Sequence, residues 1–366
     1  MMKIVFITTG LGMGGAEKQL CNLADEYVKR GHFVHIISLT DTLIIKPQKS
    51  EVKIDCLNLK KSLFGFIKAY FSARKIIIKI KPDVVHSHMI HANIFARLLR
   101  ISTPMKFLVS TMHNKNEGGR LRMLSYRFTD FLADISTNVS QEAVDEFLEK
   151  KAVTPNKIRT QYNGIDTTKF TFSQKSRISI KSELNISEND IVFLSVGRLT
   201  KAKDYPNLLV AFSHVRATYS NIKILIIGDG ELKEELHSLT KKLNLESNVI
   251  FLGLKDNIHD WMSACDFFVL SSEWEGFGLV VAEAMSCERI TIATDSGGVK
   301  EVLGNNGFLV PIKDSKKLSD AILKAISMPN LDKENLQKLA RKHIEDNFSI
   351  ENIVSNWIEI YSNAKK

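Results

Sequence analysis

The sequence predicts an α/β protein built from two Rossmann-like domains, each with a doubly wound and mostly parallel sheet. Two observations lead to this fold class. The chain has 366 residues, of which 44% are hydrophobic and 25% charged, so its composition is globular and its length exceeds a single core. Short apolar runs alternate with amphipathic stretches, as in successive βα units, and this alternation stops once and then resumes. We therefore expect two similar domains that face each other across a cleft.

The first series of elements begins with the apolar run Ile4–Ile7, which follows a lysine and precedes several glycines. We assign this run to a strand, because it is too short for a signal peptide or a membrane span. The series continues by the same alternation. Strands are expected at 3–8, 33–39, 83–87, 106–111 and 135–139, and helices at 15–30, 62–81, 90–100 and 120–133.

The polar stretch 167–190 contains no convincing strand, and we place the domain linker there. The predicted domains are 1–172 and 173–348, and a final helix occupies 349–366. In the second series we expect strands at 191–196, 222–227, 248–252, 267–271 and 290–294, and helices at 204–219, 231–243, 256–264 and 279–286, with further helices to the end.

Positive charge is concentrated in the first predicted domain. Residues 1–172 contain 26 Lys and Arg against 15 Asp and Glu, whereas residues 173–366 contain 24 against 26. The segment 60–81 has no acid and mixes its cations with aromatic and aliphatic side chains, which favours contact with an anionic membrane surface. The alternative is a core helix with a solvated basic face. Nucleic acid is not expected as a partner, because no recognised binding motif accompanies the charge.

The four cysteines are Cys21, Cys56, Cys265 and Cys287. They lie far apart in the sequence and show no metal-ligand spacing. This pattern indicates reduced, buried thiols in a cytosolic protein.

Two acids, Glu275 and Glu283, flank a glycine-rich turn and the start of a helix. Gly276 and Gly278 disfavour helix before residue 279, whereas 279–286 has the apolar periodicity of a short helix. Glu275 is then expected in a loop and Glu283 inside the helix, so that both can reach one ligand. The alternative is a surface helix with two solvated acids.

Two cations, Arg198 and Lys203, precede these acids and follow the predicted strand 191–196. Cations suit a departing diphosphate, and carboxylates accept hydrogen bonds from sugar and ribose hydroxyl groups. The four residues together therefore favour a site for a nucleotide diphospho-sugar.

A glycine-rich turn follows the first strand. Gly10, Gly12 and Gly15 match the spacing of a dinucleotide-binding motif, and Asp41 follows the second strand, so an NAD-dependent oxidoreductase is the rival interpretation. That interpretation gives the later cations and acids no role. Backbone N–H groups at a helix N-terminus bind the phosphates of a diphospho-sugar equally well.

Several motifs together resemble family 4 of the glycosyltransferases over nearly the whole chain. The motifs are Gly14-Gly15-Ala16-Glu17, Asp83-Val84-Val85-His86-Ser87-His88, Ser110-Thr111-Met112-His113, Asn163-Gly164-Ile165-Asp166, Val196-Gly197-Arg198 with Lys203, Ile227-Gly228-Asp229-Gly230-Glu231, and the pair Glu275 and Glu283. These are retaining enzymes of GT-B fold that elongate bacterial polysaccharides, lipopolysaccharides and lipid-linked sugars. One departure is Glu288-Arg289, where such chains commonly carry glycine and proline. We expect it to alter a turn rather than the chemistry.

The resemblance assigns donor-binding roles in the second domain. It implies that Arg198 and Lys203 bind the diphosphate, that Glu283 holds the ribose and that Glu275 holds the transferred hexose. The backbone N–H groups near the phosphate and sugar would be those of Phe277, Gly278 and Leu279.

The resemblance also assigns roles in the first domain. Gly14 and Gly15 would approach the same diphosphate, and His113 would donate a hydrogen bond to the hexose, the alternative being a structural loop histidine. His86, His88 and His91 superficially suggest a metal cluster. They lack a neighbouring acid or cysteine, so a place on the acceptor side or a structural role is favoured over zinc. With no Asp-x-Asp motif in the chain, we expect neither metal nor cofactor.

The resemblance implies transfer of a hexosyl or N-acetylhexosaminyl unit from a UDP- or GDP-linked donor to a lipid-linked or cell-surface glycan. The product would keep its anomeric configuration, by front-face attack without a protein nucleophile. In a double displacement Glu275 would be the nucleophile instead. The enzyme would be cytoplasmic and peripheral at the inner face of the membrane, and its last helix would cross back to the first domain. A nucleotide-sugar epimerase of the same fold and a non-catalytic carbohydrate-binding protein are further alternatives.

Overall fold

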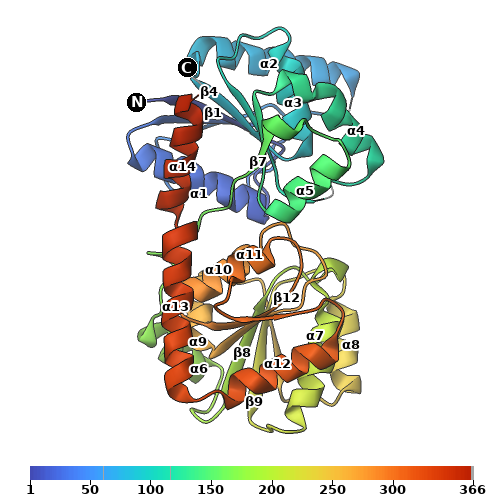
Figure 1. Cartoon of the computed structure of the whole chain (residues 1–366), viewed down its shortest axis with the longest axis vertical. Helices are drawn as coiled ribbons and strands as arrows, with labels where there is room; N and C mark the ends of the chain where they lie inside the picture. Colours follow the sequence, from blue (N-terminus) through green and yellow to red (C-terminus); the bar gives the residue numbers. More distant parts are fainter. Residues whose placement is uncertain (61, 116, 364–366) are drawn as a thin grey trace. The chain divides into compact units, whose positions relative to one another are not determined.

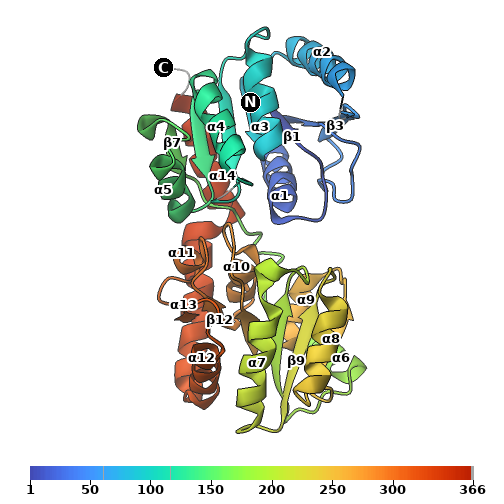
Figure 2. The ribbon, with the colours of Figure 1, turned by 90° about the vertical axis from the view of Figure 1, so that its right-hand side faces the viewer.

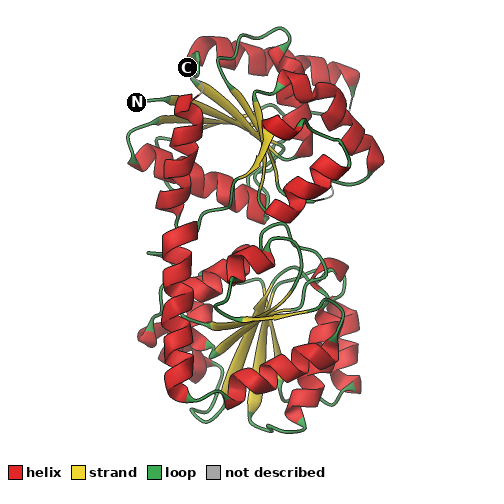
Figure 3. Cartoon of the chain, viewed as in Figure 1, coloured by secondary structure: helices red, strands yellow, loops and turns green. Residues whose placement is uncertain are grey.

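The computed structural model describes residues 1–60, 62–115 and 117–363. The chain divides into two compact units, and both are α/β layers around a parallel sheet (Figures 1 and 3). Unit 1 comprises Met1–Gly164 and Ile350–Lys366, and unit 2 comprises Ile165–Ser349. Two doubly wound domains were expected from the sequence, and the fold class is confirmed.

Unit 1 contains a seven-stranded sheet in the order β3-β2-β1-β4-β5-β6-β7, with every neighbouring pair parallel. Its strands are β1 Lys3–Thr8, β2 Phe33–Ser38, β3 Lys53–Cys56, β4 Val84–His88, β5 Leu108–Met112, β6 Ile135–Asn138 and β7 Ile158–Thr160. Its helices are α1 Gly15–Lys29, α2 Leu63–Ile80, α3 Ile90–Arg100, α4 Arg120–Thr129, α5 Gln141–Glu149 and α14 Ile350–Asn363, with 3₁₀ turns η1 Asp130–Leu132 and η2 Pro155–Lys157.

The central strand β1 is buried on both faces. Ile4 and Phe6 pack on one side with α1 and α14, whereas Val5 and Ile7 pack on the other side with α2 and α3. Successive side chains of a strand point to opposite faces, so one apolar run contributes to two helix layers. This double burial explains why the run is continuously hydrophobic rather than alternating.

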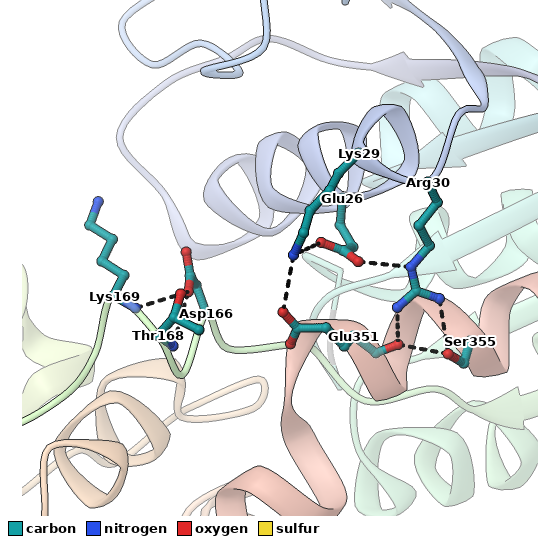
Figure 4. Close-up of polar contacts among 8 residues, drawn as sticks. All are labelled: Glu26, Lys29, Arg30, Asp166, Thr168, Lys169, Glu351 and Ser355. Carbon is teal, nitrogen blue, oxygen red and sulfur yellow. Dashed lines mark hydrogen bonds and ion pairs between the residues drawn. The ribbon is translucent and has the colours of Figure 1, made fainter.

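Helix α14, the last helix of the chain, completes the core of unit 1. Its buried face includes Ile353, Trp357 and Tyr361, and the Tyr361 ring stacks on Tyr27 of α1 with centroids 5.9 Å apart. Arg30, at the end of α1, donates hydrogen bonds to the carbonyl oxygen of Glu351 and to Ser355 Oγ (Figure 4). Helix α14 thus belongs to unit 1, and residues 364–366 of the predicted final helix lie outside the described residues.

Unit 2 contains a six-stranded parallel sheet in the order β10-β9-β8-β11-β12-β13 (Figure 2). Its strands are β8 Ile191–Val196, β9 Ile222–Ile227, β10 Val249–Gly253, β11 Phe267–Leu270, β12 Ile290–Thr294 and β13 Phe308–Val310. Its helices are α6 Gln174–Glu183, α7 Tyr205–Arg216, α8 Lys233–Lys242, α9 Ile258–Ala264, α10 Leu279–Ser286, α11 Val299–Leu303, α12 Ser315–Ser327 and α13 Asn330–Phe348, with the 3₁₀ turn η3 Lys201–Lys203.

The change from unit 1 to unit 2 falls after Gly164, earlier in the chain than the boundary we placed after residue 172. The backbone N–H of Ile165 already donates to the carbonyl oxygen of Phe348, and Ser286 Oγ donates to the carbonyl oxygen of Phe170. The segment 165–172 is polar in sequence, but these hydrogen bonds attach it to unit 2.

Five elements were not expected from the sequence: β3, α5, β7, α6 and β13. Three of them are strands of three or four residues, too short to show a period. Helix α6 lies in the polar stretch where we placed the linker, and within it only Ile180 and Lys181 are buried. Such short or polar elements form because neighbouring elements pair with them or pack on them, so their sequences alone carry a weak signal.

Candidate active site

Each sheet has one point where the strand order reverses. In unit 2 this point lies between β8 and β11, which are parallel neighbours, and in unit 1 it lies between β1 and β4. Ligands of open α/β sheets bind beyond the carboxyl ends of the strands at such points. The loops after these four strands are therefore the first places to look for a site.

The loop after β8 carries the two predicted cations of unit 2. Arg198 is exposed and forms no ion pair with any described carboxylate. Lys203 ends the turn η3, and its side chain passes over Gly197, where an added Cβ would lie 3.0 Å from Lys203 Cε. Arg198 is thus accessible to an incoming anion, whereas the side chain of Lys203 is held against Gly197.

The loop after β11 is fastened to the turn that contains Lys203. Ser271 Oγ donates to the carbonyl oxygen of Lys203 over 2.8 Å, and the backbone N–H of Glu273 donates to that of Ala202 over 2.9 Å. These two hydrogen bonds join loops that are about 70 residues apart in the sequence and make them one structural piece.

Lys203 and Glu275 form an ion pair at the centre of this piece. Lys203 Nζ lies 2.5 Å from Glu275 Oε1, and Ser272 Oγ donates to the same oxygen over 2.7 Å. The two charged side chains are 19% and 13% exposed, so water screens the pair only partly. The ammonium therefore fixes the position of the carboxylate, and the contribution of Ser272 was not foreseen from the sequence.

The turn between the two predicted acids depends on glycine. Gly278 has φ +87° and precedes the first residue of α10. At Gly297, where φ is +57°, an added Cβ would lie 2.0 Å from the carbonyl oxygen of Glu275. Both positions need a residue without a side chain. This turn leaves Glu275 in a loop at the start of α10, as expected from the sequence.

The remaining residues predicted for the donor lie on α10 or at its start. Phe277 is buried, and its ring packs on Phe348 with centroids 5.6 Å apart. Glu283 belongs to the second turn of α10 and is 3% exposed, while Leu279 is half-buried. Burial of a carboxylate to this extent raises the free energy of the folded state unless the carboxylate has a polar partner. Glu283 is therefore not a solvated surface acid.

In unit 1, the glycine turn leads into α1. Gly14 is the N-cap residue and Gly15 the first helical residue. An added Cβ at Gly14 would lie 2.3 Å from Glu17 Oε2, so this carboxylate folds back over the helix N-terminus. An acidic group at this position interacts favourably with the N-terminal end of the helix dipole.

His113 follows β5 and contacts a second histidine. Its Nε2 lies 3.1 Å from His88 Nδ1, and its backbone N–H donates to Glu117 Oε1 over 3.2 Å. Burial lowers the pKa of His113 from 6.5 to about 4, so its ring is neutral near pH 7.

His86 and His88 lie inside unit 1 and not on its surface. His86 has no exposed surface, and its two ring nitrogens form hydrogen bonds with Tyr361 Oη and Thr111 Oγ1, both at 2.6 Å. His88 is 1% exposed. Because the β4 strand that carries them is buried on both faces, their burial favours the structural role that the sequence analysis left open, and a place on the acceptor side stays a prediction.

The Glu288-Arg289 departure changes the packing as well as the turn. Glu288 has φ +60°, and Arg289 is buried, donating to the carbonyl oxygens of Cys287 and Cys265.

Burial raises the pKa of the Cys265 thiol to about 12. Cys21 and Cys287 are also buried, whereas Cys56 is only partly buried.

Within the described part of the chain, no group of three or more His, Cys, Asp or Glu side chains is arranged to hold a metal ion. The same residues include no helix that is long and apolar enough to cross a membrane.

Two family profiles match the chain in succession. Residues 13–169 match "Glycosyltransferase Family 4", and residues 176–343 match "Glycosyl transferases group 1". The chain belongs to the glycosyltransferases. The oxidoreductase interpretation of the Gly10, Gly12 and Gly15 turn is therefore not retained.

Solved structures confirm the GT-B fold of this glycosyltransferase. HepE from Anabaena, solved with UDP and glucose, superimposes with a TM-score of 0.87 at 22% identity, over 99% of this chain and all of that one. WaaG, a glycosyltransferase involved in lipopolysaccharide biosynthesis, gives a TM-score of 0.75 at 16% identity over 98% and 99% of the two chains.

Characterised relatives of the glycosyltransferase share somewhat more sequence. It is 33% identical to the N-acetyl-alpha-D-glucosaminyl L-malate synthase of Bacillus anthracis, over 64% of this chain and 61% of the relative. It is 27% identical to the N-acetylgalactosamine-N,N'-diacetylbacillosaminyl-diphospho-undecaprenol 4-alpha-N-acetylgalactosaminyltransferase of Campylobacter jejuni, over 87% and 88% of the two chains.

Proposed function

We propose that the enzyme transfers a hexosyl or N-acetylhexosaminyl unit from a nucleotide diphospho-sugar to a lipid-linked glycan, with retention of configuration. The observation that carries this proposal is the arrangement of Arg198, Lys203 and Glu275 on loops after β8 and β11, at the switch point of the unit 2 sheet. Relatives with undecaprenol-linked acceptors support the choice of acceptor class.

The two cations have different parts in this proposal. Arg198 is exposed and unpaired among the described residues, so it can take up the diphosphate by its guanidinium fork. Lys203 is already paired with Glu275. A bound diphosphate would therefore compete with the Glu275 carboxylate for the Lys203 ammonium. As the bond to the sugar breaks, negative charge grows on the diphosphate, and both cations stabilise that charge more than the ground state.

Glu275 binds hydroxyl groups of the hexose in this proposal and does not attack it. Its Oε1 accepts hydrogen bonds from Lys203 and Ser272, so lone pairs of this oxygen are already engaged and the carboxylate is held in place. The leaving phosphate would then accept the proton of the acceptor hydroxyl on the same face, which retains the configuration. Glu283 would hold the ribose, and the N-terminus of α10 would face the phosphate.

In unit 1, Gly14, Gly15 and His113 are the residues that we propose for donor binding. A phosphate oxygen would replace the Glu17 carboxylate at the start of α1, where the helix dipole and free N–H groups favour an anion. We propose UDP as the carrier, on the basis of the UDP complexes of HepE, with GDP as the alternative. The scheme uses no metal, because Arg198, Lys203 and the N-terminus of α10 offset the negative charge that grows on the diphosphate.

The acceptor would be reached at the inner face of the cytoplasmic membrane. Helix α2 exposes Leu63, Phe64 and Phe71, which are 78%, 79% and 61% exposed, beside the exposed cations of the same helix. Helix α4 and the turn η1 add Phe128 and Phe131, 72% and 74% exposed. Large apolar side chains among lysines and arginines bind the interface of an anionic bilayer. Lys61, also part of the predicted basic segment, lies outside the described residues.

The direct test is transfer from a panel of radiolabelled UDP- and GDP-sugars to undecaprenyl diphosphate carrying one or two sugars. We expect one UDP-sugar to support transfer, in EDTA as well as in magnesium, and NMR of the product to show the anomeric configuration of the donor. Transfer from none of the donors, or an inverted product, would overturn the proposal.

A further inference from the structure

Within unit 1, the buried His88 contacts His113, the residue proposed to bind the donor hexose. His88 is the last residue of β4, and His113 directly follows the neighbouring strand β5. Their rings are nearly parallel, with centroids 5.3 Å apart and an interplanar angle of 27°, and His88 Nδ1 lies 3.1 Å from His113 Nε2. This distance is that of a hydrogen bond, so one of the two nitrogens carries a hydrogen and the other does not.

Both rings are neutral, so a single proton lies between them. Burial lowers the pKa of His113 to about 4 and that of His88 well below its usual value. A neutral imidazole carries one N–H, and the proton between the rings therefore decides the tautomer of both. Either His88 donates to His113, or His113 donates to His88.

The surroundings of His88 distinguish the two cases. Its other ring nitrogen, Nε2, is buried, and no described residue forms a hydrogen bond with it. If His113 donated to His88 Nδ1, the hydrogen of His88 would have to be on Nε2, as a buried N–H without an acceptor. Buried N–H groups without an acceptor are rarer than buried acceptors without a donor. The more stable arrangement leaves Nε2 bare and places the hydrogen of His88 on Nδ1.

We propose that His88 is a positioning residue that donates from Nδ1 to His113 Nε2 and thereby keeps the hydrogen of His113 on Nδ1. The Nδ1–H of His113 can then only donate. No described residue forms a hydrogen bond with this nitrogen, so it is available to an oxygen atom of a ligand. This inference rests on the proposed function for the identity of that oxygen, which would be a hydroxyl oxygen of the donor hexose.

The chemistry follows from the fixed tautomer. A hydroxyl group can donate or accept, and a histidine that is free to change tautomer can adapt to either case. A histidine held as a donor binds only an acceptor, so the hydroxyl must direct its own hydrogen elsewhere. His88 thus selects the orientation of one sugar hydroxyl without contacting the sugar.

The tautomer can be measured without any substrate. Two-bond ¹H–¹⁵N correlation spectra of the full-length protein with ¹⁵N-labelled histidine distinguish Nδ1–H from Nε2–H, and the His113→Gln variant identifies the His113 signals. We expect His113 to carry its hydrogen on Nδ1, against the Nε2–H form that neutral histidine favours in water.

We expect the His88→Asn variant to keep this tautomer, because the Asn amide can place an N–H near the position of Nδ1. The His88→Phe variant should lose it. Nε2–H on His113 of the parent, or an unchanged spectrum in His88→Phe, overturns the proposal.

Transfer kinetics provide the second readout. His88→Phe and His113→Phe should each lower kcat/KM, and the double variant should be no slower than the slower single variant, because both act through one hydrogen bond. His88→Asn should recover most of the activity, whereas His88→Gln, whose amide lies nearer to the position of Nε2, should not. Additive losses would overturn the positioning role. If the parent transferred no sugar, the proposed function would fail, while the NMR result would still decide the tautomer.

Discussion

The ammonium nitrogen of Lys203 and the Oε1 atom of Glu275 lie 2.5 Å apart, although the two residues follow different strands, β8 and β11. Each of these residues was assigned to the donor from the sequence, but their contact with each other was not foreseen. A cation and a carboxylate that are already paired do not need to rearrange when a substrate arrives.

Removal of either cation should slow the chemical step. We expect Arg198→Ala and Lys203→Ala each to lower kcat about 100- to 1,000-fold, the loss that follows deletion of one group that stabilises transition-state charge. Lys201→Ala is the matched control, because Lys201 is an exposed cation on the same turn η3. Single-turnover rates with saturating donor give the comparison. Parent-like rates in both variants, with folding verified by circular dichroism, would exclude the site.

Loss of the Glu275 carboxylate should affect binding of the sugar more than binding of the nucleotide. Glu275→Gln keeps the size of the side chain but weakens the bond from Lys203. We expect a large fall in kcat/KM for the donor and a much smaller change in the Kd of UDP, measured by calorimetry. Glu273→Gln is the control. Glu273 lies on the same loop as Glu275 but pairs with Lys313 instead of Lys203. Equal losses of sugar and nucleotide binding would contradict the assignment.

The surface of α2 predicts salt-dependent membrane binding. Replacing the exposed Lys68, Lys75 and Lys79 by alanine should weaken binding to anionic vesicles by roughly 3 kcal/mol at low salt, at about 1 kcal/mol for each cation. Co-sedimentation with vesicles of phosphatidylglycerol and phosphatidylethanolamine measures the change. The control is a triple variant of unit 2 in which three exposed lysines, Lys241, Lys242 and Lys317, are replaced by alanine. Equal binding by both triple variants would exclude the predicted surface.

Acid should destabilise unit 1 through its buried histidines. The pKa of His113 in the folded state, about 4, is below its unfolded value near 6.5, and His86 and His88 are shifted in the same direction by burial. Between these values the unfolded chain binds more protons, so stability is complete above pH 6.5 and falls as the pH drops toward 4. Hydrogen exchange of unit 1 peptides against pH measures this loss. His113→Gln should flatten the dependence, whereas substitution of the exposed His214 should not.

Arg30 should contribute to stability more than its neighbour Lys29. Arg30 pairs with the buried Glu26 and donates two hydrogen bonds to α14, whereas Lys29 is 59% exposed (Figure 4). Arg30→Ala should lower the free energy of unfolding by about 1.5–3 kcal/mol, as for the loss of hydrogen bonds to a charged group. Lys29→Ala should cost about 0–1 kcal/mol. Urea denaturation of the full chain compares the two, and similar losses would contradict the assigned contacts.

The parallel strands and the long helices could be predicted because their apolar period is strong, and the family motifs marked the loops after β8 and β11. What could not be predicted depends on contacts between distant segments. Ser272 gives no sequence signal, since its hydroxyl matters only where Glu275 Oε1 lies 2.7 Å away. His86 and His88 resemble surface ligands in the sequence, yet β4 is a central strand and buries them. The domain boundary near residue 164 could not be predicted. A loop that is hydrogen-bonded to a domain and a solvated linker between domains have similar amino-acid compositions.

Helix α14 supplies a face of the hydrophobic core of unit 1, and the whole of unit 2 separates it in sequence from the other members of that core. Until α14 has been synthesised, the rings of Tyr27 and Phe6 lack part of the layer that later covers them. A chain truncated before residue 350 would therefore leave unit 1 with an open core, and with it a tendency to aggregate or to be degraded.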